Sequence, residues 1–277
     1  MRLISTRHHA PEVNFKEALF QGLAPDGGLY HPVENKSAAP LLEKLSPEST
    51  FVRIAEEISR LWLCDEWDEA ALKRIVTRAF FFAPVLTELG DGVFLQELFH
   101  GPSSAFKDFG ACFLASCMEE ILLEKKRHAV ILVATSGDTG SAVAKAFYGK
   151  KNIDVVILYP SGRVSFLQEK QLTTLDGNVH SLEVKGSFDD CQRLVKVAFQ
   201  DESLTRKLTL TSANSINIGR LFPQSFYYFD AALKLRTHVS DAPVFCVPSG
   251  NFGNLTAGVY AWKWELPVAH FIAATNV

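Results

Sequence analysis

Residues 129–159 read AVILVATSGDTGSAVAKAFYGKKNIDVVILY. The runs Ala129–Ala134 and Ile153–Tyr159 are continuously apolar, and between them apolar residues recur at helical spacing from Ser141 to Tyr148. Short apolar runs separated by a helix predict parallel strands that are buried on both faces of a sheet. This stretch therefore predicts an open α/β fold, in which ligands bind at the carboxyl ends of the strands.

The same alternation continues through the rest of the chain. Further strands are expected at Val179–Val184, Leu208–Thr211, Val244–Val247 and Val268–Ala274. Further helices are expected at Val164–Leu175, Ser187–Gln200, Ile216–Arg236 and Leu255–Trp264. Pro223 should bend or split the third of these helices, because proline lacks the N–H that a helix needs. Ser187, with Asp190 three residues later, predicts a capping box at the start of the second. These elements predict mainly parallel, open sheets with flanking helices.

The chain before residue 94 has a different pattern. Apolar residues recur at helical spacing in Thr50–Trp62, and Ala24–Gly28 is a strong turn signal. The polar stretch Pro32–Ser49 is expected to form a surface connection. The expected organisation is a mainly helical region over residues 1–93, followed by a two-lobed α/β region over residues 94–277.

Composition excludes several classes of function. A net charge of −3 and a pI near 6.2 argue against nucleic acid or an anionic membrane as the main partner. The five cysteines are scattered without a C-x-x-C pair, which argues against a disulfide framework or a zinc site and favours the cytoplasm. His8 and His9 are adjacent, which is not a metal-ligand spacing, so no metal site is expected. No apolar run is long enough for a membrane span.

Two loops share the order strand, Ser-Gly-x-x-Gly, helix. They are Thr135–Gly140 (TSGDTG) and Pro248–Asn254 (PSGNFGN). Glycines let the backbone approach a ligand closely, and the N–H groups at the start of the following helix bind phosphate or carboxylate. One such loop alone is as often a plain turn. Two loops with matching openings favour two anionic groups bound close together, and neither loop matches a nucleotide-binding fingerprint.

Lys107 lies in the segment HGPSSAFKDFG, residues 100–110, ahead of a helix expected to run to about Leu123. Ser103 or Ser104 can cap this helix, which places Lys107 in its first turn. There the helix dipole and the flanking phenylalanines would favour the neutral amine that imine chemistry requires. The alternative is an ordinary solvated lysine neutralised by Asp108. By these arguments alone Lys107 is a candidate for binding pyridoxal phosphate.

The sequence resembles threonine synthases of the bacterial and fungal type along essentially its whole length. The matching motifs are STR (5–7), FKEALFQGLAPDGGLYHP (15–32), FHGPSSAFKDFG (99–110), TSGDTG (135–140), AFYG (146–149), VVILYPSG (155–162), LQEKQ (167–171), NSINIGRL (214–221) and VPSGNFGNLTAG (247–258). The lysine segment together with VPSGNFGN is highly specific, whereas TSGDTG marks only the wider class of pyridoxal-phosphate enzymes. The resemblance implies fold type II of these enzymes, similar to the β subunit of tryptophan synthase.

The resemblance also implies residue roles. Lys107 matches the lysine that forms a Schiff base with pyridoxal 5′-phosphate and acts as the general base. The residues implied to grip the cofactor phosphate are Gly250, Asn251, Phe252, Gly253 and Asn254. The residues implied to face the substrate are Thr135, Ser136, Gly137, Asp138, Thr139, Asn214, Ser215, Asn217 and Arg220. Asn254 departs from the family pattern, which often has aspartate there.

The implied reaction converts O-phospho-L-homoserine and water to L-threonine and phosphate, which makes the protein a lyase of threonine biosynthesis. Two alternatives remain open from the sequence. One is a phosphohomoserine lyase or a dehydratase of the same fold. The other is a non-catalytic cofactor-binding protein, because threonine synthases continue well beyond residue 277 and the chain is expected to be truncated. The sequence does not indicate an oligomeric state.

Overall fold

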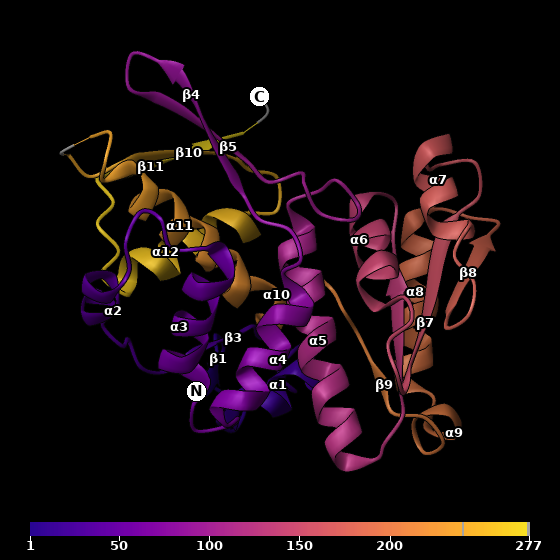
Figure 1. The fold of residues 1–277 in the computed structure, drawn as a ribbon. Helices are drawn as coiled ribbons and strands as arrows, with labels where there is room; N and C mark the ends of the chain where they lie inside the picture. The colour runs from indigo at the N-terminus through magenta and orange to yellow at the C-terminus, as the bar shows by residue number, and fades with distance from the viewer. Residues whose placement is uncertain (240, 276–277) are drawn as a thin grey trace.

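A computed structural model describes residues 1–239 and 241–275 and contains a four-stranded parallel sheet, with the order β8-β7-β6-β9 (Figure 1). Its strands are β6 (Ala129–Ala134), β7 (Ile153–Pro160), β8 (Val179–Val184) and β9 (Leu210–Thr211). The intervening helices are α6 (Asp138–Phe147), α7 (Phe166–Thr173), α8 (Phe188–Gln200) and α9 (Glu202–Thr205). The parallel α/β organisation predicted from the sequence is confirmed.

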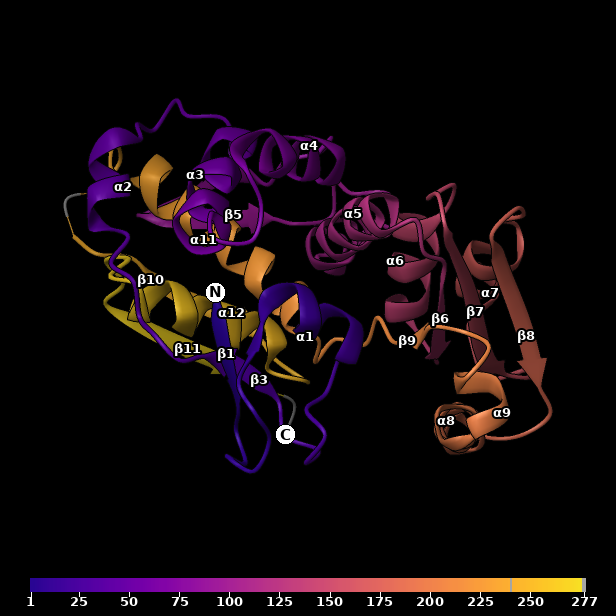
Figure 2. The same ribbon diagram turned by 90° about the horizontal axis from the view of Figure 1, so that it is seen from below.

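Strands β6 and β7 lie at the centre of this sheet. Their residues are apolar because helices cover both faces of the sheet. Ile131, Val133, Val155 and Ile157 are fully buried. Helices α6 and α7 lie on one face and α8 on the other (Figure 2), as right-handed crossovers require when the strand order reverses after β8. The predicted capping box of α8 is present, with Ser187 as the N-cap.

The second parallel sheet pairs β10 (Val244–Pro248) with β11 (His270–Ala274), joined by α12 (Gly253–Lys263). The single long helix expected before it is split, as anticipated at Pro223. Its parts are α10 (Ile218–Leu221), the 3-10 turn η1 (Phe222–Gln224) and α11 (Ser225–Leu235). A proline at this point cannot donate the N–H that would continue the helix.

The N-terminal region contains four helices and also small sheets. The stretch Pro32–Ser49, expected to be a surface connection, contains one of these helices, with Leu41 and Leu42 buried. The helices are α1 (Phe15–Gln21), α2 (Ala39–Lys44), α3 (Phe51–Leu63) and α4 (Glu69–Ala79). An antiparallel sheet of order β2-β1-β3 joins β1 (Arg2–Ser5), β2 (Val13–Asn14) and β3 (Tyr30–Pro32). A hairpin of β4 (Val85–Gly90) and β5 (Val93–Glu97) follows. Two- to four-residue strands are too short to show alternation, so the sequence missed the first sheet.

Helix α5 (Lys107–Lys125) runs through the middle of the molecule, between α4 and α6 (Figures 1 and 2). It is buried nearly all round, including Phe109, Phe113 and Met118, so its sequence shows little amphipathic periodicity. None of the helices formed by residues 1–239 and 241–275 combines the length and apolar character that a membrane crossing needs.

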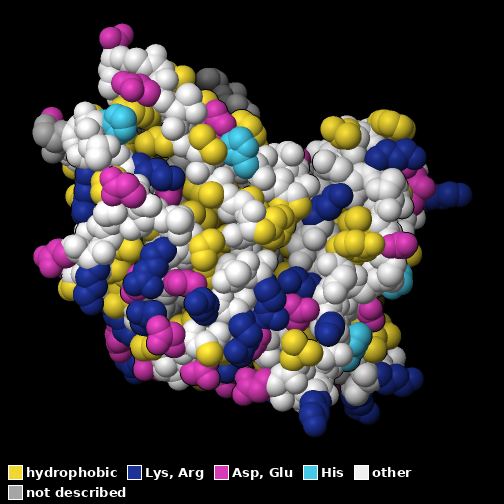
Figure 3. All heavy atoms as spheres, in the orientation of Figure 1, with side chains coloured by type: hydrophobic (Ala, Val, Ile, Leu, Met, Phe, Trp, Pro, Cys, Tyr) yellow, Lys and Arg dark blue, Asp and Glu magenta, His cyan; other side chains and the backbone are white. Residues whose placement is uncertain are grey.

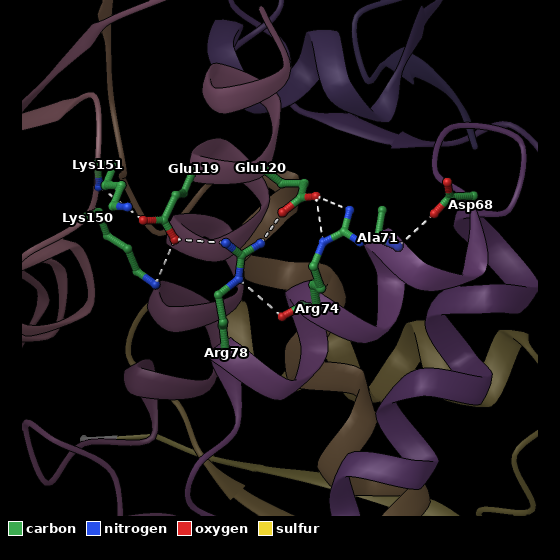
Figure 4. Close-up of polar contacts among 8 residues, drawn as sticks. All are labelled: Asp68, Ala71, Arg74, Arg78, Glu119, Glu120, Lys150 and Lys151. Atoms are coloured by element: carbon green, nitrogen blue, oxygen red, sulfur yellow. Dashed lines mark hydrogen bonds and ion pairs between the residues drawn. The ribbon is translucent and has the colours of Figure 1, made fainter. Parts of the chain in front are cut away.

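A charged network ties α5 to its neighbours on both sides (Figure 4). Glu119 of α5 accepts a hydrogen bond from Arg78 of α4 at 3.2 Å and from the Lys151 backbone N–H at 3.0 Å. Glu120 accepts from Arg74 at 3.1 Å and also pairs with Arg78. Since both glutamates are largely buried, this network fixes α5, and with it Lys107, relative to α4 and the segment before β7.

Candidate active site

Both glycine loops follow the carboxyl end of a parallel strand, as predicted, and each runs directly into a helix. Helix α6 begins at Asp138 and α12 at Gly253, two or three residues earlier than the apolar patterns suggested. Within residues 1–239 and 241–275, neither N-cap residue makes a side-chain hydrogen bond to its helix, although the Thr135 hydroxyl accepts from the Gly140 N–H in the first turn of α6. The other N–H groups of the two first turns are available to an anion.

The first loop is shaped by Thr135. Its buried hydroxyl donates to the Gly137 carbonyl at 3.0 Å and accepts from the Gly140 N–H at 3.0 Å. A Cβ on Gly140 would lie 2.4 Å from the Thr135 methyl, so a glycine is required there. Ser136 is exposed at the turn. Within this loop Thr135 holds the backbone, and Ser136 faces outward.

The second loop is strained at Phe252, which has a φ of 55° in the left-handed region although it is not a glycine. This conformation turns the chain so that Gly253 begins α12 beside Leu221, 3.6 Å from the position of a Cβ. A Cβ on Gly250 would meet no atom within 4 Å, because that side of the loop faces open space. Backbone strain of this kind is kept where a ligand-binding geometry requires it.

Lys107 is the first residue of α5 and pairs with the first loop. Its Nζ lies 3.3 Å from Oδ2 of Asp138 and 5.0 Å from the centre of the Phe106 ring. Desolvation acts to raise the pKa of Asp138, but the charge of Lys107 and a hydrogen bond from Gln168 outweigh it and hold that pKa below its usual value. The structure therefore gives Lys107 a counter-ion from another element.

The expected serine cap of α5 is absent, which corrects the sequence prediction. Phe106 stands at the N-cap without a side-chain hydrogen bond. Instead Asp108 is fully buried and accepts from the Ser103 backbone N–H at 2.8 Å and its hydroxyl at 2.5 Å. Asp108 is thus bonded to Ser103, and Lys107 pairs with Asp138 instead, which argues against the alternative in which Asp108 neutralises this lysine.

A cavity of about 220 Å³ brings some of the predicted residues together, but no residue of the first loop lines it. It joins Lys107 to the second loop from Gly250 to Asn254 and to Ser215 and Arg220. Four further residues line it that the sequence did not single out as site residues: Phe106, Gln224, Pro248 and Ser249. The lysine amine and the anion-binding loop therefore share one hollow.

Arg220 is a second basic residue of this cavity, beside Lys107. Its side chain is fully buried, and Nη1 donates to the Ala213 carbonyl at 3.0 Å. Its Nε and Nη2 have no hydrogen-bond partner among the described residues. Burial lowers the pKa of Arg220 to about 10, while the charge of Asp108 acts in the opposite direction. A buried guanidinium with unpaired donors calls for an anion, because desolvated charge is costly when unpaired.

Asn254 is held by two tyrosines that the sequence did not indicate. Its Oδ1 accepts from the Tyr227 hydroxyl at 2.6 Å and the Tyr228 hydroxyl at 2.8 Å. Burial raises the pKa of both phenols, so both remain hydrogen-bond donors at neutral pH. This contact fastens the start of α12 to α11 and fixes the second loop.

The remaining residues predicted to face the substrate lie in different environments. Asn214 is exposed and Ser215 lines the cavity. Asn217 is buried and caps α10: its Oδ1 accepts from the Gly219 N–H at 2.9 Å, and its Nδ2 donates to the Leu19 carbonyl at 2.8 Å. Thr139 follows Asp138 in the first turn of α6. Substrate contacts of these residues stay a prediction.

A larger groove, of about 770 Å³, adjoins the cavity through Phe106, Pro248 and Asn254. It lies between β5, α11 and β10 and is lined mainly by apolar side chains such as Phe94 and Phe245. Figure 3 shows hydrophobic side chains gathered where the surface is hollowed next to the hairpin. Its apolar character distinguishes this groove from the cavity around Lys107 and Arg220.

Comparison with known proteins agrees with this geometry. Residues 77–277 match the family model of the pyridoxal-phosphate dependent enzyme, and residues 2–80 match that of the threonine synthase N terminus. The chain belongs to the pyridoxal-phosphate dependent enzymes. Threonine synthases of Serratia marcescens and Escherichia coli K12 are 47% and 46% identical to it over its whole length. The chain spans 64% of the length of each of these relatives.

Solved structures extend the comparison to the fold. A pyridoxal-phosphate-bound threonine synthase from Brucella melitensis is 40% identical with a TM-score of 0.92, covering 100% of this chain and 61% of that one. Yeast threonine synthase is 36% identical with a TM-score of 0.91, covering 99% and 58%. A serine racemase from Dictyostelium discoideum, 17% identical with a TM-score of 0.53, shares the fold alone. The predicted fold type II and the pyridoxal-phosphate cofactor class are confirmed.

Proposed function

We propose that this protein acts as a threonine synthase, converting O-phospho-L-homoserine and water to L-threonine and phosphate. The observation that carries the proposal is the shared cavity, in which an amine, an anion-binding loop and a buried guanidinium with unpaired donors meet. Similarity to threonine synthases over the whole chain supports the substrate and the reaction. The five cysteines are free, which supports the cytoplasm as its location.

The residues of the cavity fit pyridoxal phosphate. Lys107 would hold the cofactor through its amine, and the loop from Gly250 to Gly253 with Arg220 would hold the phosphate. The open side of Gly250 leaves room for close backbone approach, and Arg220 offers two unpaired donors. When bound, the cofactor supplies an electron sink that stabilises negative charge on substrate carbons.

The chain's own groups then bind, orient and move protons. Lys107 is placed to take the proton from the substrate Cα once its amine is free, and to return protons at neighbouring carbons. Asp138 keeps the amine in place through its 3.3 Å contact. The first turn of α6, with Ser136 and Thr139, presents N–H and hydroxyl donors that suit the anionic groups of the substrate.

Product analysis tests the proposal directly. The protein, as the full reading frame, would be supplied with pyridoxal phosphate and O-phospho-L-homoserine, and both phosphate and threonine would be measured. Equal amounts of threonine and phosphate are expected. Phosphate without threonine would show a phosphohomoserine lyase, and neither product from a folded protein that binds the cofactor would show a non-catalytic one.

A further inference from the structure

Gln168 is hydrogen bonded at both ends of its side-chain amide. Its Oε1 accepts from the Ser165 backbone N–H at 3.3 Å, which closes a capping box at the start of α7. Its Nε2 donates to Oδ1 of Asp138 at 3.1 Å. The same Nε2 lies 3.7 Å from the position of a Cβ on Gly137, so Gln168 covers the first glycine loop.

Asp138 in turn uses its two carboxylate oxygens for different partners. Oδ1 accepts from Gln168, and Oδ2 faces the Lys107 amine at 3.3 Å. The Asp138 side chain is 54% exposed, so packing alone does not select its rotamer. A hydrogen bond from a side chain that is itself anchored removes much of this freedom.

We propose that Gln168 is a positioning residue, which holds Asp138 against Lys107 and thereby sets the availability of the lysine amine. The proposal rests on the proposed function of Lys107. By this proposal the start of α7 influences the lysine, although α7 packs on the four-stranded sheet and Lys107 belongs to α5. An exposed ion pair with a free aspartate would contribute little, since side-chain entropy opposes it.

The competing explanation is that Gln168 serves only the start of α7. Ser165 provides the matched control for it. The Ser165 hydroxyl accepts from the Gln168 backbone N–H at 3.3 Å, so Ser165→Ala weakens the same capping box. It leaves the Gln168 amide free to bond Asp138. A purely structural role predicts the same effect from Ser165→Ala and Gln168→Leu.

The test measures the reactivity of Lys107 itself, without cofactor or substrate. The wild-type protein and the variants Asp138→Asn, Gln168→Leu and Ser165→Ala would be treated briefly with acetic anhydride at pH 8. Acetylation of Lys107 would be measured by mass spectrometry, with the surface lysine Lys170 as internal reference. An amine held in an ion pair with a carboxylate, as Lys107 is at 3.3 Å from Asp138, must leave that contact before it can attack the anhydride.

We expect Asp138→Asn to acetylate Lys107 about 1.5- to 5-fold faster, the range of a partly exposed ion pair. Gln168→Leu should raise the acetylation rate by at least the square root of the factor found for Asp138→Asn. Ser165→Ala should leave the rate unchanged. An unchanged rate in Gln168→Leu or in Asp138→Asn, or an equal increase in Ser165→Ala, would overturn the proposal. Borohydride reduction in the presence of pyridoxal phosphate separately shows whether Lys107 binds the cofactor. Failure of the proposed function can therefore be distinguished from failure of the proposal for Gln168.

Discussion

The amine of Lys107 lies 3.3 Å from the carboxylate of Asp138, although 31 residues separate them in the sequence. Asp108, the neighbour of Lys107 in the chain, is buried and bonded to Ser103 instead. The turn of helix α5 directs adjacent residues to different sides, so sequence neighbours do not share an environment. The counter-ion of the lysine therefore comes from the glycine loop after β6.

Replacement of Lys107 should abolish covalent attachment of the cofactor. With Lys107→Ala, pyridoxal phosphate should give no visible absorption band of a bound imine, and borohydride should leave no cofactor adduct at this position. Lys170→Ala, which removes an exposed lysine of helix α7, should behave as wild type. A reduced adduct on a different lysine in the wild-type protein would contradict the assignment.

Side chains on the second loop should weaken cofactor binding more than side chains on the first. Gly250→Val and Gly253→Val fill space that we assign to the phosphate, whereas Gly137→Val faces Gln168. All three positions leave room for at least a Cβ, so the proteins should fold. Gly140→Ala is the contrasting case, because its Cβ would overlap Thr135 and destabilise the loop. Cofactor titration with each variant checks the ranking; the reverse order would exchange the roles of the loops.

Arg220→Met should remove most of the affinity for inorganic phosphate. A single hydrogen bond from a charged donor contributes about 1.5–3 kcal/mol, so loss of even one should raise the dissociation constant by about 10- to 100-fold. Thermal melting with and without phosphate measures this: phosphate should raise the melting temperature of the wild type but hardly that of the variant. Arg206→Met, at an exposed arginine, is the matched control. An equal phosphate effect in both variants would show that Arg220 does not face the anion.

Asn254→Asp should be tolerated and Asn254→Leu should not. An aspartate still accepts from Tyr227 and Tyr228, and negative charge is favoured near a helix N-terminus by about 0.3–1 kcal/mol. A leucine removes the close acceptor of the buried Tyr227 hydroxyl, at about 1–3 kcal/mol, whereas Tyr228 can still donate to the backbone carbonyl of residue 254 at 3.0 Å. Chemical unfolding of both variants measures the difference. Equal stability of the two variants would show that the tyrosines find other partners.

Asp108 should make stability depend on pH. Burial raises its pKa in the folded state, although the bonds from Ser103 oppose this. A raised folded pKa contributes stability that is present below the unfolded value of 3.8 and lost as pH rises through the folded value. The stability of the wild type relative to Asp108→Asn should therefore fall as pH increases from about 4. A constant difference across this range would contradict the raised pKa.

The sequence by itself determined the strands of the two parallel sheets and the two glycine loops. Ala129–Ala134 was predicted at its observed bounds, because residues buried on both faces of a sheet form a continuous apolar run. The edge strand Val179–Val184 was also predicted at its observed bounds, although its residues are mostly not buried. The two glycine loops and the split at Pro223 were also visible, since glycine and proline act on the local backbone. Lys107 emerged from its motif, and its role as cofactor lysine stays a prediction.

Tertiary structure alone decided which groups meet. It placed Arg220 in the cavity with unpaired donors, committed Asn217 to capping α10, and brought Tyr227 to Asn254. It also aligned Gln168 with Asp138 across two helices of one sheet face. Such contacts depend on how helices pack after long crossovers. A contact between side chains that are distant in sequence produces no periodic pattern in the sequence, so it cannot be predicted from one. Local patterns fix the elements, whereas burial and hydrogen bonding between elements fix the site.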